Sequence, residues 1–449
     1  MLPLLSLAQA VRTSFSKRHL AQLASLSLTV TIAGMTNQPV LAQTLSEKIV
    51  NMERGLEQEF ESYFDADLAD VTQPPEEIAI ALARIGQETG TRPAILWAIP
   101  KAEHLHLVLV TPDGDPVVRD LYDVPEDVLG QAVDDFHLEM HGDKSMMFAS
   151  QKLHSWMVEP FEADYLEAEG IDTILFCLGN GLRSLPLAAL SNGESFLLER
   201  YSLTRIPAFN LIQTDYSPVE QDRVLAMGAS EFQELSPLPA VTAELDNVLS
   251  AWHPASSRER LSRAFLNEEF TLDNLTQQLE TESPEIVHLA THAVFKPGAP
   301  ENSYIQLWNE PLKLNNIRSV NWQNPAVELI VLSACRTAIG DDEAELGFAG
   351  LTLQSGAKSA LASIWNVSDT GTLALMSEFY RQMGETSTKA EALRQAQLKM
   401  LKGEVRVEGE RLRLSRGDVT LPAGINREEA NDLSSPYYWA AFTMVGSPW

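Results

Sequence analysis

The sequence predicts an α/β fold in which a mostly parallel sheet is flanked by helices. Short apolar segments of strand length alternate with longer segments of helical spacing along the chain of 449 residues, as a layered α/β protein requires. One segment, Glu328–Leu332, is largely apolar, as strands buried inside a parallel sheet are. The chain shows no repeat of about 20 to 50 residues, so we do not expect a helical-repeat array.

The first half of the chain is predicted to begin with helices. Apolar residues recur at helical spacing from Leu45 to Leu56, and Pro74-Pro75 ends this region before a second helix. The turn signal at Pro112–Asp115 separates two strands of a hairpin. The predicted helices are Thr44–Glu59, Glu76–Thr89, Glu126–Phe136 and Ser150–Glu167, and the predicted strands are Ala94–Ile99, His104–Thr111, Val117–Leu121, Thr173–Leu178 and Phe196–Ile206.

A second alternation of strands and helices follows a polar linker at Gln213–Arg223. This linker divides the chain into predicted domains at residues 44–215 and 224–449. The predicted strands of the second domain are Val224–Gly228, Glu285–Thr291, Glu328–Leu332, Lys358–Trp365 and Trp439–Val445, and its predicted helices are Ala240–Ala251, Phe270–Glu280, Gly347–Ser355, Asp369–Met383 and Lys389–Leu401.

Two local features of the second domain also have predicted structures. Asp369 precedes a helical segment and is a residue type favoured at a helix N-cap. Gly403–Ser434 interrupts the α/β pattern with many charged residues, and Gly409 lies between two short strand-like runs. We expect this stretch to be an insertion or flexible flap that contains a charged hairpin.

Residues 1–43 have the composition of a leader. They contain no Asp or Glu, and a basic start is followed by an apolar run, Leu20–Met35, that is diluted by polar residues. Val40-Leu41-Ala42 is a small-x-small pattern of the kind that signal peptidases cut. We expect a cleaved export signal and a periplasmic or extracellular protein. An uncleaved anchor and a cytoplasmic leader are the alternatives, and the run is too short and polar for a stable membrane span.

Charge and cysteine content exclude several classes of function. The chain has 33 Lys and Arg against 62 Asp and Glu, a formal net charge of −29, so phosphate backbones are repelled and a basic protein or peptide is the easier partner. Its 2 cysteines, Cys177 and Cys335, are too few for a disulfide framework or a cysteine-based zinc site. The 9 histidines do not cluster with acids at metal-ligand spacing along the sequence, so we expect no metal and no cofactor.

Two predicted strands end in reactive side chains. His292 follows the strand at Glu285–Thr291, and Cys335 follows the strand at Glu328–Leu332. Reactive groups in an open parallel sheet lie just beyond the carboxyl ends of its strands. A thiol becomes nucleophilic when it loses its proton, and an imidazole is a suitable base. The pair therefore indicates a thiol nucleophile with a histidine base.

Residue types alone leave a structural interpretation open. A cysteine near a strand end is more often a small buried hydrophobic residue, and a histidine in a strand is more often packed. We expect Cys177 to be such a buried thiol, and His288 to be packed or to support the site.

The second domain resembles the CHAT domain, a caspase-like module related to separase and abundant in bacteria. The matching segments occur in the family's order, and as a set they are specific, although each alone is weak. The preceding part, Thr173–Pro207, also resembles the family, so the resemblance covers most of the chain after about residue 90. The matching segments of the second domain are His288–His292, Leu332–Ala338, Glu345–Gly350, Leu361–Asp369 and Pro436–Phe442.

The resemblance implies a caspase-like layered fold, preceded by a related or degenerate α/β half. It implies that His292 is the general base and Cys335 the nucleophile, with 43 residues between them; caspases place the two roughly 50 residues apart. The oxyanion would be held by the backbone N–H groups of Ala293 and Cys335. Ala293 stands where many caspase-like enzymes have glycine, and it keeps the N–H donor.

Asp369 matches the acidic position of separase-like sequences that receives the basic side chain before the cleaved bond. An acid there selects Arg or Lys by a charge-assisted pair. A helix cap alone would also explain Asp369, and Asp341 or Asp342 are alternatives, although a solvated loop charge is the commoner role for them.

The sequence therefore supports two functions from different classes. One is a cysteine endopeptidase that cleaves protein substrates, with a regulatory protein as a further partner. The other is a catalytically silent or partner-gated scaffold on the same fold. A serine α/β-hydrolase is excluded because Gly228–Phe232 lacks the second glycine of the nucleophile elbow. Dinucleotide binding is excluded because Gly179–Ser184 ends in Ser where the fingerprint needs Gly.

Overall fold

The structure is a computed structural model. It describes residues 43–68, 72–141, 147–219, 223–252, 264–320, 322, 327–337, 341–423, 425 and 432–449, with backbone only at residues 252, 334–337 and 342. The predicted leader at residues 1–43 lies outside these ranges except for Gln43. Within the described ranges, no helix has both the length and the apolar character needed to cross a membrane.

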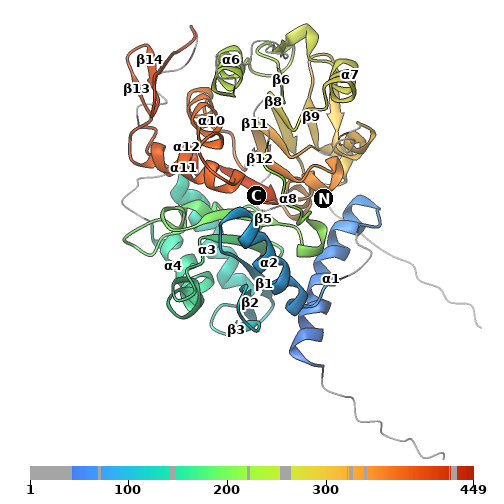
Figure 1. The fold of residues 1–449 in the computed structure, drawn as a ribbon, viewed down its shortest axis with the longest axis vertical. Coiled ribbons are helices and arrows are strands. Elements are labelled where there is room, and N and C mark those ends of the chain that lie inside the picture. The colour runs from blue at the N-terminus through green and yellow to red at the C-terminus, as the bar shows by residue number, and fades with distance from the viewer. Residues whose placement is uncertain are drawn as a thin grey trace, which may run out of the picture. The chain divides into compact units, whose positions relative to one another are not determined.

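One sheet of 13 strands runs through both halves of the described chain (Figure 1). Its strands are β1 (Pro93–Lys101), β2 (His104–Val110), β3 (Val117–Leu121), β4 (Thr173–Leu178), β5 (Ser202–Ile206), β6 (Val224–Gly228), β7 (Phe265–Leu266), β8 (Ile286–Phe295), β9 (Tyr304–Gln306), β10 (Pro311–Lys313), β11 (Leu329–Thr337), β12 (Ser359–Ser363) and β16 (Phe442–Gly446). Strands β6, β8, β11 and β12 are parallel, and so are β1, β4 and β5. The predicted α/β fold with a mostly parallel sheet is confirmed.

The two halves of the sheet meet at β16. This strand pairs antiparallel with β12 and parallel with β5, through Val445 and Arg205. The parallel strands of one half therefore run opposite to those of the other half. Residues Thr44–Trp449 form one compact unit, and the division into domains at 44–215 and 224–449 stays a prediction.

Helices cover both faces of the second half of the sheet (Figure 1). Ala226 and Ala290 pack in one cluster with residues of α6, whereas Met227 and Leu289 belong to the cluster that contains residues of α7. Neighbouring residues of a strand point to opposite faces, so α6 and α7 lie on opposite sides. The main helices are α1 (Leu45–Phe64), α2 (Pro75–Thr89), α3 (Glu126–Met140), α4 (Phe148–Met157), α6 (Val241–Trp252), α7 (Leu272–Glu282), α8 (Asp342–Ala349), α9 (Leu351–Ser355), α10 (Asp369–Met383), α11 (Lys389–Leu401) and α12 (Pro436–Trp439).

Two strands begin later in the structure than the sequence predicts. In Phe196–Ile206, the first residues form a 3₁₀ turn at Leu197–Glu199, because the Phe196 N–H donates to the Glu199 carboxylate at 2.8 Å. Only Ser202–Ile206 is extended. The predicted strand Trp439–Val445 likewise starts in α12, since a proline at the first position favours a helix, and it becomes a strand at Phe442.

Two predicted helices are broken. The one at Ser150–Glu167 ends as α4 at Met157, and Pro160 lies in the short helix α5 (Glu159–Phe161) that follows. The one at Gly347–Ser355 is divided at Gly350 into α8 and α9. A side chain at Gly350 would collide with the Phe64 ring of α1, so the glycine lets α1 pack beside α8.

The predicted insertion at Gly403–Ser434 contains the expected charged hairpin. Strands β13 (Arg406–Glu408) and β14 (Arg411–Arg413) pair antiparallel, Gly409 adopts a φ of +63° in the turn, and β15 (Asp418–Thr420) adds a third strand. Buried Glu378 of α10 accepts hydrogen bonds from Ser415, at 3.2 Å from the backbone N–H and 2.6 Å from Oγ. The described part of the insertion is therefore anchored to α10.

A buried glutamate holds α1 against the first half of the sheet. The side chain of Glu53 is fully buried and accepts hydrogen bonds from the Trp97 indole on β1, from the Phe209 N–H at 2.9 Å and from the Asn210 amide at 3.3 Å. Burial raises the pKa of Glu53 from 4.5 to about 7, because the charged form loses its hydration. The carboxyl group is therefore protonated in the folded protein under mildly acidic conditions.

We expect Glu53 to destabilise the folded protein as the pH rises from 4.5 to about 7. In this range the unfolded chain loses the Glu53 proton before the folded protein does, so deprotonation favours unfolding. The difference in unfolding free energy between wild type and Glu53→Gln should shift by on the order of 3 kcal/mol across the range. Denaturant unfolding at several pH values measures this shift. The exposed α2 variant Glu77→Gln should show no such shift, and an equal pH dependence in all three proteins would contradict the expectation.

Candidate active site

The register of β8 and β11 brings the two predicted catalytic residues onto neighbouring strands. Ala334 pairs with His292, and Cys335 pairs with Ala293. Both pairs lie near the carboxyl ends of the two parallel strands, after an irregularity in the register at Leu332/Ala334. The side chain of Cys335 lies outside the described part of the structure, but its backbone is adjacent to that of His292. The register therefore brings the backbones of the two positions together, and their roles as base and nucleophile stay a prediction.

The ring of His292 is held by the loop that follows β6. Its Nε2 atom lies 2.8 Å from the backbone carbonyl oxygen of Ser236, and the Phe232 ring packs against it with centroids 4.8 Å apart. A carbonyl oxygen only accepts, so Nε2 carries the proton, and in the neutral ring Nδ1 is then the proton acceptor. His292 is half-buried. The loop thus orients an imidazole in the tautomer that suits a general base acting through Nδ1.

Ala293 is buried and paired on both sides. Its partners are Cys335 on β11 and Ile305 on β9, and its N–H therefore points along the sheet toward a neighbouring strand. The oxyanion role of Ala293 and Cys335 stays a prediction. For that role, the Ala293 N–H has to turn out of the sheet.

Asp369 is the first residue of α10, which follows β12 in the chain. The predicted helix cap at Asp369 is wrong: Ser368 is the N-cap, and its Oγ accepts a hydrogen bond from the Gly371 N–H at 3.2 Å. Serine satisfies this N–H from one residue earlier, so Asp369 lies in the first turn, where its charge suits the helix dipole. Asp369 is half-buried, and its contact with a substrate stays a prediction.

Of the two alternative acids, one has a structural role, and the side chain of the other lies outside the described part of the structure. Asp341 caps α8 by accepting a hydrogen bond from the Ala344 N–H at 2.9 Å, so it is more than a solvated loop charge. The side chain of Asp342 lies outside the described part. Asp341 therefore caps α8, the helix that follows β11 in the chain.

A cavity of about 580 Å³ is lined by Phe232, which contacts His292, whereas His292 itself does not line the cavity. One wall consists of residues 232–235 of the loop after β6, and the other consists of β9 and the turn into β10. Phe232 both lines this cavity and packs on the His292 ring. The lining residues include Glu234 and Glu310 and neither Lys nor Arg. No sequence pattern indicated this cavity, because no element was predicted between Ala293 and Glu328.

The other two predicted structural residues are packed, as expected. His288 is fully buried, with Nδ1 3.0 Å from the Tyr380 hydroxyl and Nε2 3.0 Å from the Glu244 carboxylate. Cys177 is fully buried, its thiol donates to the Pro207 carbonyl oxygen at 3.3 Å, and burial raises its pKa well above the ordinary value. Neither residue reaches the described part of the candidate site.

One group of potential metal ligands escaped the sequence analysis. His104, His106 and Asp120 lie on β2 and β3, and their donor atoms are all within 4.8 Å of one another. The expectation that no histidine clusters with an acid is therefore wrong in three dimensions. The hairpin register brings Asp120 opposite His106, and linear spacing does not reveal it.

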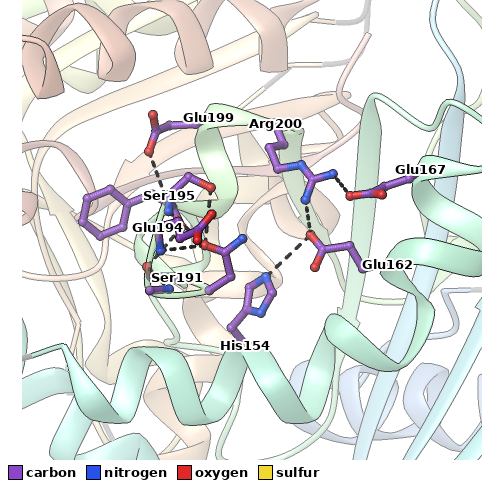
Figure 2. A network of polar contacts seen from close by, with 11 residues as sticks. His154, Glu162, Glu167, Ser191, Glu194, Ser195, Glu199 and Arg200 are labelled. Atoms are coloured by element: carbon purple, nitrogen blue, oxygen red, sulfur yellow. Dashed lines mark hydrogen bonds and ion pairs between the residues drawn. The ribbon is translucent and has the colours of Figure 1, made fainter.

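A further polar cluster ties together parts of the first half (Figure 2). Arg200 pairs with Glu162 at 2.7 Å and with Glu167, and His154 Nε2 lies 3.8 Å from the same Glu162 oxygen. Burial lowers the pKa of His154 to about 4, so its ring is neutral near neutral pH. The ion pairs fix the π-helical turn η1 (Glu162–Glu167) to the segment of Arg200, which is a structural role.

A layered α/β sheet with the predicted base and nucleophile on neighbouring parallel strands defines the caspase-like class of fold. The chain belongs to the CHAT domain family, whose sequence profile matches residues 149–447. Comparison with curated proteins finds no match.

Among solved structures, the fold is similar to a chain of the Saccharomyces cerevisiae separase–securin complex at 2.6 Å resolution. The TM-score is 0.46 at 10% identity, over 90% of this chain and 34% of that chain. A second structure of the complex, at 3.0 Å, gives a TM-score of 0.44 at 10% identity, over 83% of this chain and 31% of that one. The chain thus spans about a third of the length of those chains.

Two histidines four residues apart on β8 should respond differently to substitution. His288→Ala leaves the Glu244 carboxylate and the Tyr380 hydroxyl buried without their histidine partner, so we expect the free energy of unfolding to fall by about 3 to 5 kcal/mol. His292→Ala removes a half-buried ring at the rim of the sheet and should cost about 1 kcal/mol or less. Equilibrium unfolding in denaturant measures both losses. Equal losses would contradict the assignment of His288 to the core and His292 to the site.

Proposed function

We propose that this CHAT domain protein is a cysteine endopeptidase that uses His292 and Cys335 as a dyad and cleaves protein substrates after a basic residue. The observation that carries the proposal is the register of β8 and β11, which sets Cys335 beside the residue next to His292. The hydrogen bond from His292 Nε2 to the Ser236 carbonyl adds support, because it leaves Nδ1 to act as the base.

The reaction follows from these groups. Nδ1 of His292 takes the proton of the Cys335 thiol, and the thiolate attacks the carbonyl carbon of the substrate. The imidazolium then gives its proton to the leaving amine, and a thioester remains on Cys335. Water, deprotonated by the same imidazole, attacks the thioester and releases the acid product and the free thiol. Asp369, at the start of α10, selects Arg or Lys before the cleaved bond by a charge-assisted pair.

The second candidate function is a scaffold or an enzyme that a regulatory protein opens. The observation that favours it is the pairing of Ala293 with strands on both sides, which keeps its N–H within the sheet. A partner that releases this pairing would present the donor to the oxyanion. Without a partner, the same pairing would leave the protein silent.

We expect the purified protein to hydrolyse fluorogenic peptides that end in Arg or Lys far faster than matched peptides that end in Ala. Cys335→Ala and His292→Ala should each lower kcat/KM by about a thousandfold or more, because each removes a group that forms or breaks bonds. Cys177→Ala is the matched control, since this thiol is buried in the first half of the sheet, and it should keep the wild-type rate.

Labelling separates the two candidate functions. Mass spectrometry after treatment with iodoacetamide should find Cys335 modified in the folded wild type, and His292→Ala should slow the labelling. A folded protein that neither hydrolyses the peptides nor labels at Cys335 would contradict the peptidase proposal and favour the scaffold. Hydrolysis that persists in either dyad variant would remove that residue from the mechanism.

A further inference from the structure

We propose that the cavity beside His292 binds the substrate residues that follow the cleaved bond and prefers a basic side chain there. This inference rests on the proposed peptidase function and extends it to the leaving-group side of the substrate. Nothing in the family resemblance assigned the walls of this cavity, which are residues 232–235 and the region from β9 to β10.

The position of the cavity indicates which part of a substrate it receives. β11, which carries Cys335, lies on one side of β8, whereas β6 and β9 pair with the other side of β8. The walls of the cavity come from the loop after β6 and from β9. His292 therefore lies between the strand of Cys335 and the cavity.

The chemistry of the dyad indicates on which side of His292 each part of the substrate lies. The acyl part of the substrate becomes bonded to the Cys335 sulfur, and the leaving amine takes its proton from the imidazole of His292. The amine and the residues attached to it must therefore depart on the imidazole side. That side is the one on which Phe232 joins the His292 ring to the cavity.

The lining residues favour a cationic side chain. Glu234 and Glu310 bring two exposed carboxylates, and no lining residue is basic. Phe232, Tyr304 and Trp308 add aromatic surface, which binds Arg or Lys through both the aliphatic stem and the cation. Two lysines lie close to Tyr304 without lining the cavity: Nζ of Lys296 is 5.1 Å from the Tyr304 ring centroid, and Lys313 of β10 pairs with Tyr304 of β9. A volume of about 580 Å³ lies in the range of small-ligand sites, enough for one or two residues.

The test compares two kinds of substrate with the same residues before the cleaved bond. Internally quenched peptides carry Arg, Ala or Glu in the two positions after the bond, and a fluorogenic amide carries only a dye there. In wild type, we expect the Arg peptide to have a kcat/KM at least about tenfold above the Glu peptide. The double variant Glu234→Gln/Glu310→Gln should lose most of this preference, and Trp308→Ala should lower kcat/KM for all three peptides.

The controls separate failure of this inference from failure of the proposed function. Glu231→Gln changes an exposed acid of the same loop outside the cavity lining and should keep the preference. Glu231→Gln and the double variant should hydrolyse the fluorogenic amide within about twofold of wild type, because the uncharged dye forms no ion pair with Glu234 or Glu310. A preference unchanged in the double variant, or an equal loss on both kinds of substrate, would overturn the inference alone. Absence of hydrolysis of every substrate by wild type would overturn the proposed function and this inference with it.

A separate group of side chains on β2 and β3 supports a second, independent inference. We infer that His104, His106 and Asp120 bind a divalent transition metal such as Zn²⁺. His104 and His106 are two residues apart on β2, and such residues share one face of a strand. Asp120 Oδ1 on β3 lies 2.6 Å from His106 Nδ1 and 3.4 Å from His104 Nε2.

The three ligands suit this class of metal. Imidazole nitrogens and a carboxylate are the ligands that Zn²⁺ takes in three-ligand sites, with a water in the fourth position. All the donor atoms lie within 4.8 Å of one another, so small side-chain movements are enough to bring them around one ion. The rigid hairpin register holds the ligands, and Tyr122 stacks on His104 with centroids 4.8 Å apart.

Isothermal titration of the full chain with ZnCl₂ tests this site. Cys335→Ala serves as the starting protein, so that the candidate active-site thiol does not compete for the metal. We expect one equivalent of Zn²⁺ to bind, and His104→Ala/His106→Ala to abolish this binding. The control His141→Ala changes a histidine outside the cluster and should bind as before. No binding, or binding retained by the double variant, would overturn the inference.

Discussion

The pairing of β8 with β11 is the constraint on which the candidate active site depends. His292 and Cys335 are 43 residues apart in the chain, and a dyad needs them within a few ångströms. Adjacent strands lie about 4.8 Å apart, so the register alone brings their backbones to that range. The strand cores favour this register, because Val287, Leu289, Val331 and Leu332 are fully buried and a slip by one residue would move each to the opposite face of the sheet, where other side chains pack.

The first half of the chain supports this arrangement from the far side of β16. Arg205 of β5 is buried, and its guanidinium donates to the carbonyl oxygens of Arg183 and Leu185 and to the Thr443 hydroxyl on β16. Burial lowers its pKa to about 10, and Glu345 of α8 opposes that shift. Ser184 also donates to Glu345 at 2.5 Å. These contacts therefore connect the first half of the chain to α8, the helix that follows β11 in the chain.

Features of the fold that depend on local sequence patterns could be predicted from the sequence. Features that depend on strand register or on packing between distant segments could not. The apolar runs predicted two strands near His292 and Cys335, so the approach of these residues was predictable, but β8 and β11 continue past them to Phe295 and Thr337. The helix cap at Ser368 was missed because Asp369, one residue later, is an equally good capping type. Asp120 joined His106 only through the β2–β3 register, and the cavity walls at Tyr304 and Trp308 belong to short strands and turns with no period to read.

Ala293 shows how the same pairing both builds the site and restrains it. β8 is held between β11 and β9, and this position puts His292 between the strand of Cys335 and the cavity. The same strand pairing holds the Ala293 N–H in the plane of the sheet. An oxyanion donor, in contrast, has to point at the reacting carbonyl. β9 is only three residues long and pairs with β8 through two residue pairs, so it is the weaker of the two contacts of Ala293. Since β9 also forms a wall of the cavity, a substrate or partner bound there contacts the weaker of the two strands that pair with Ala293.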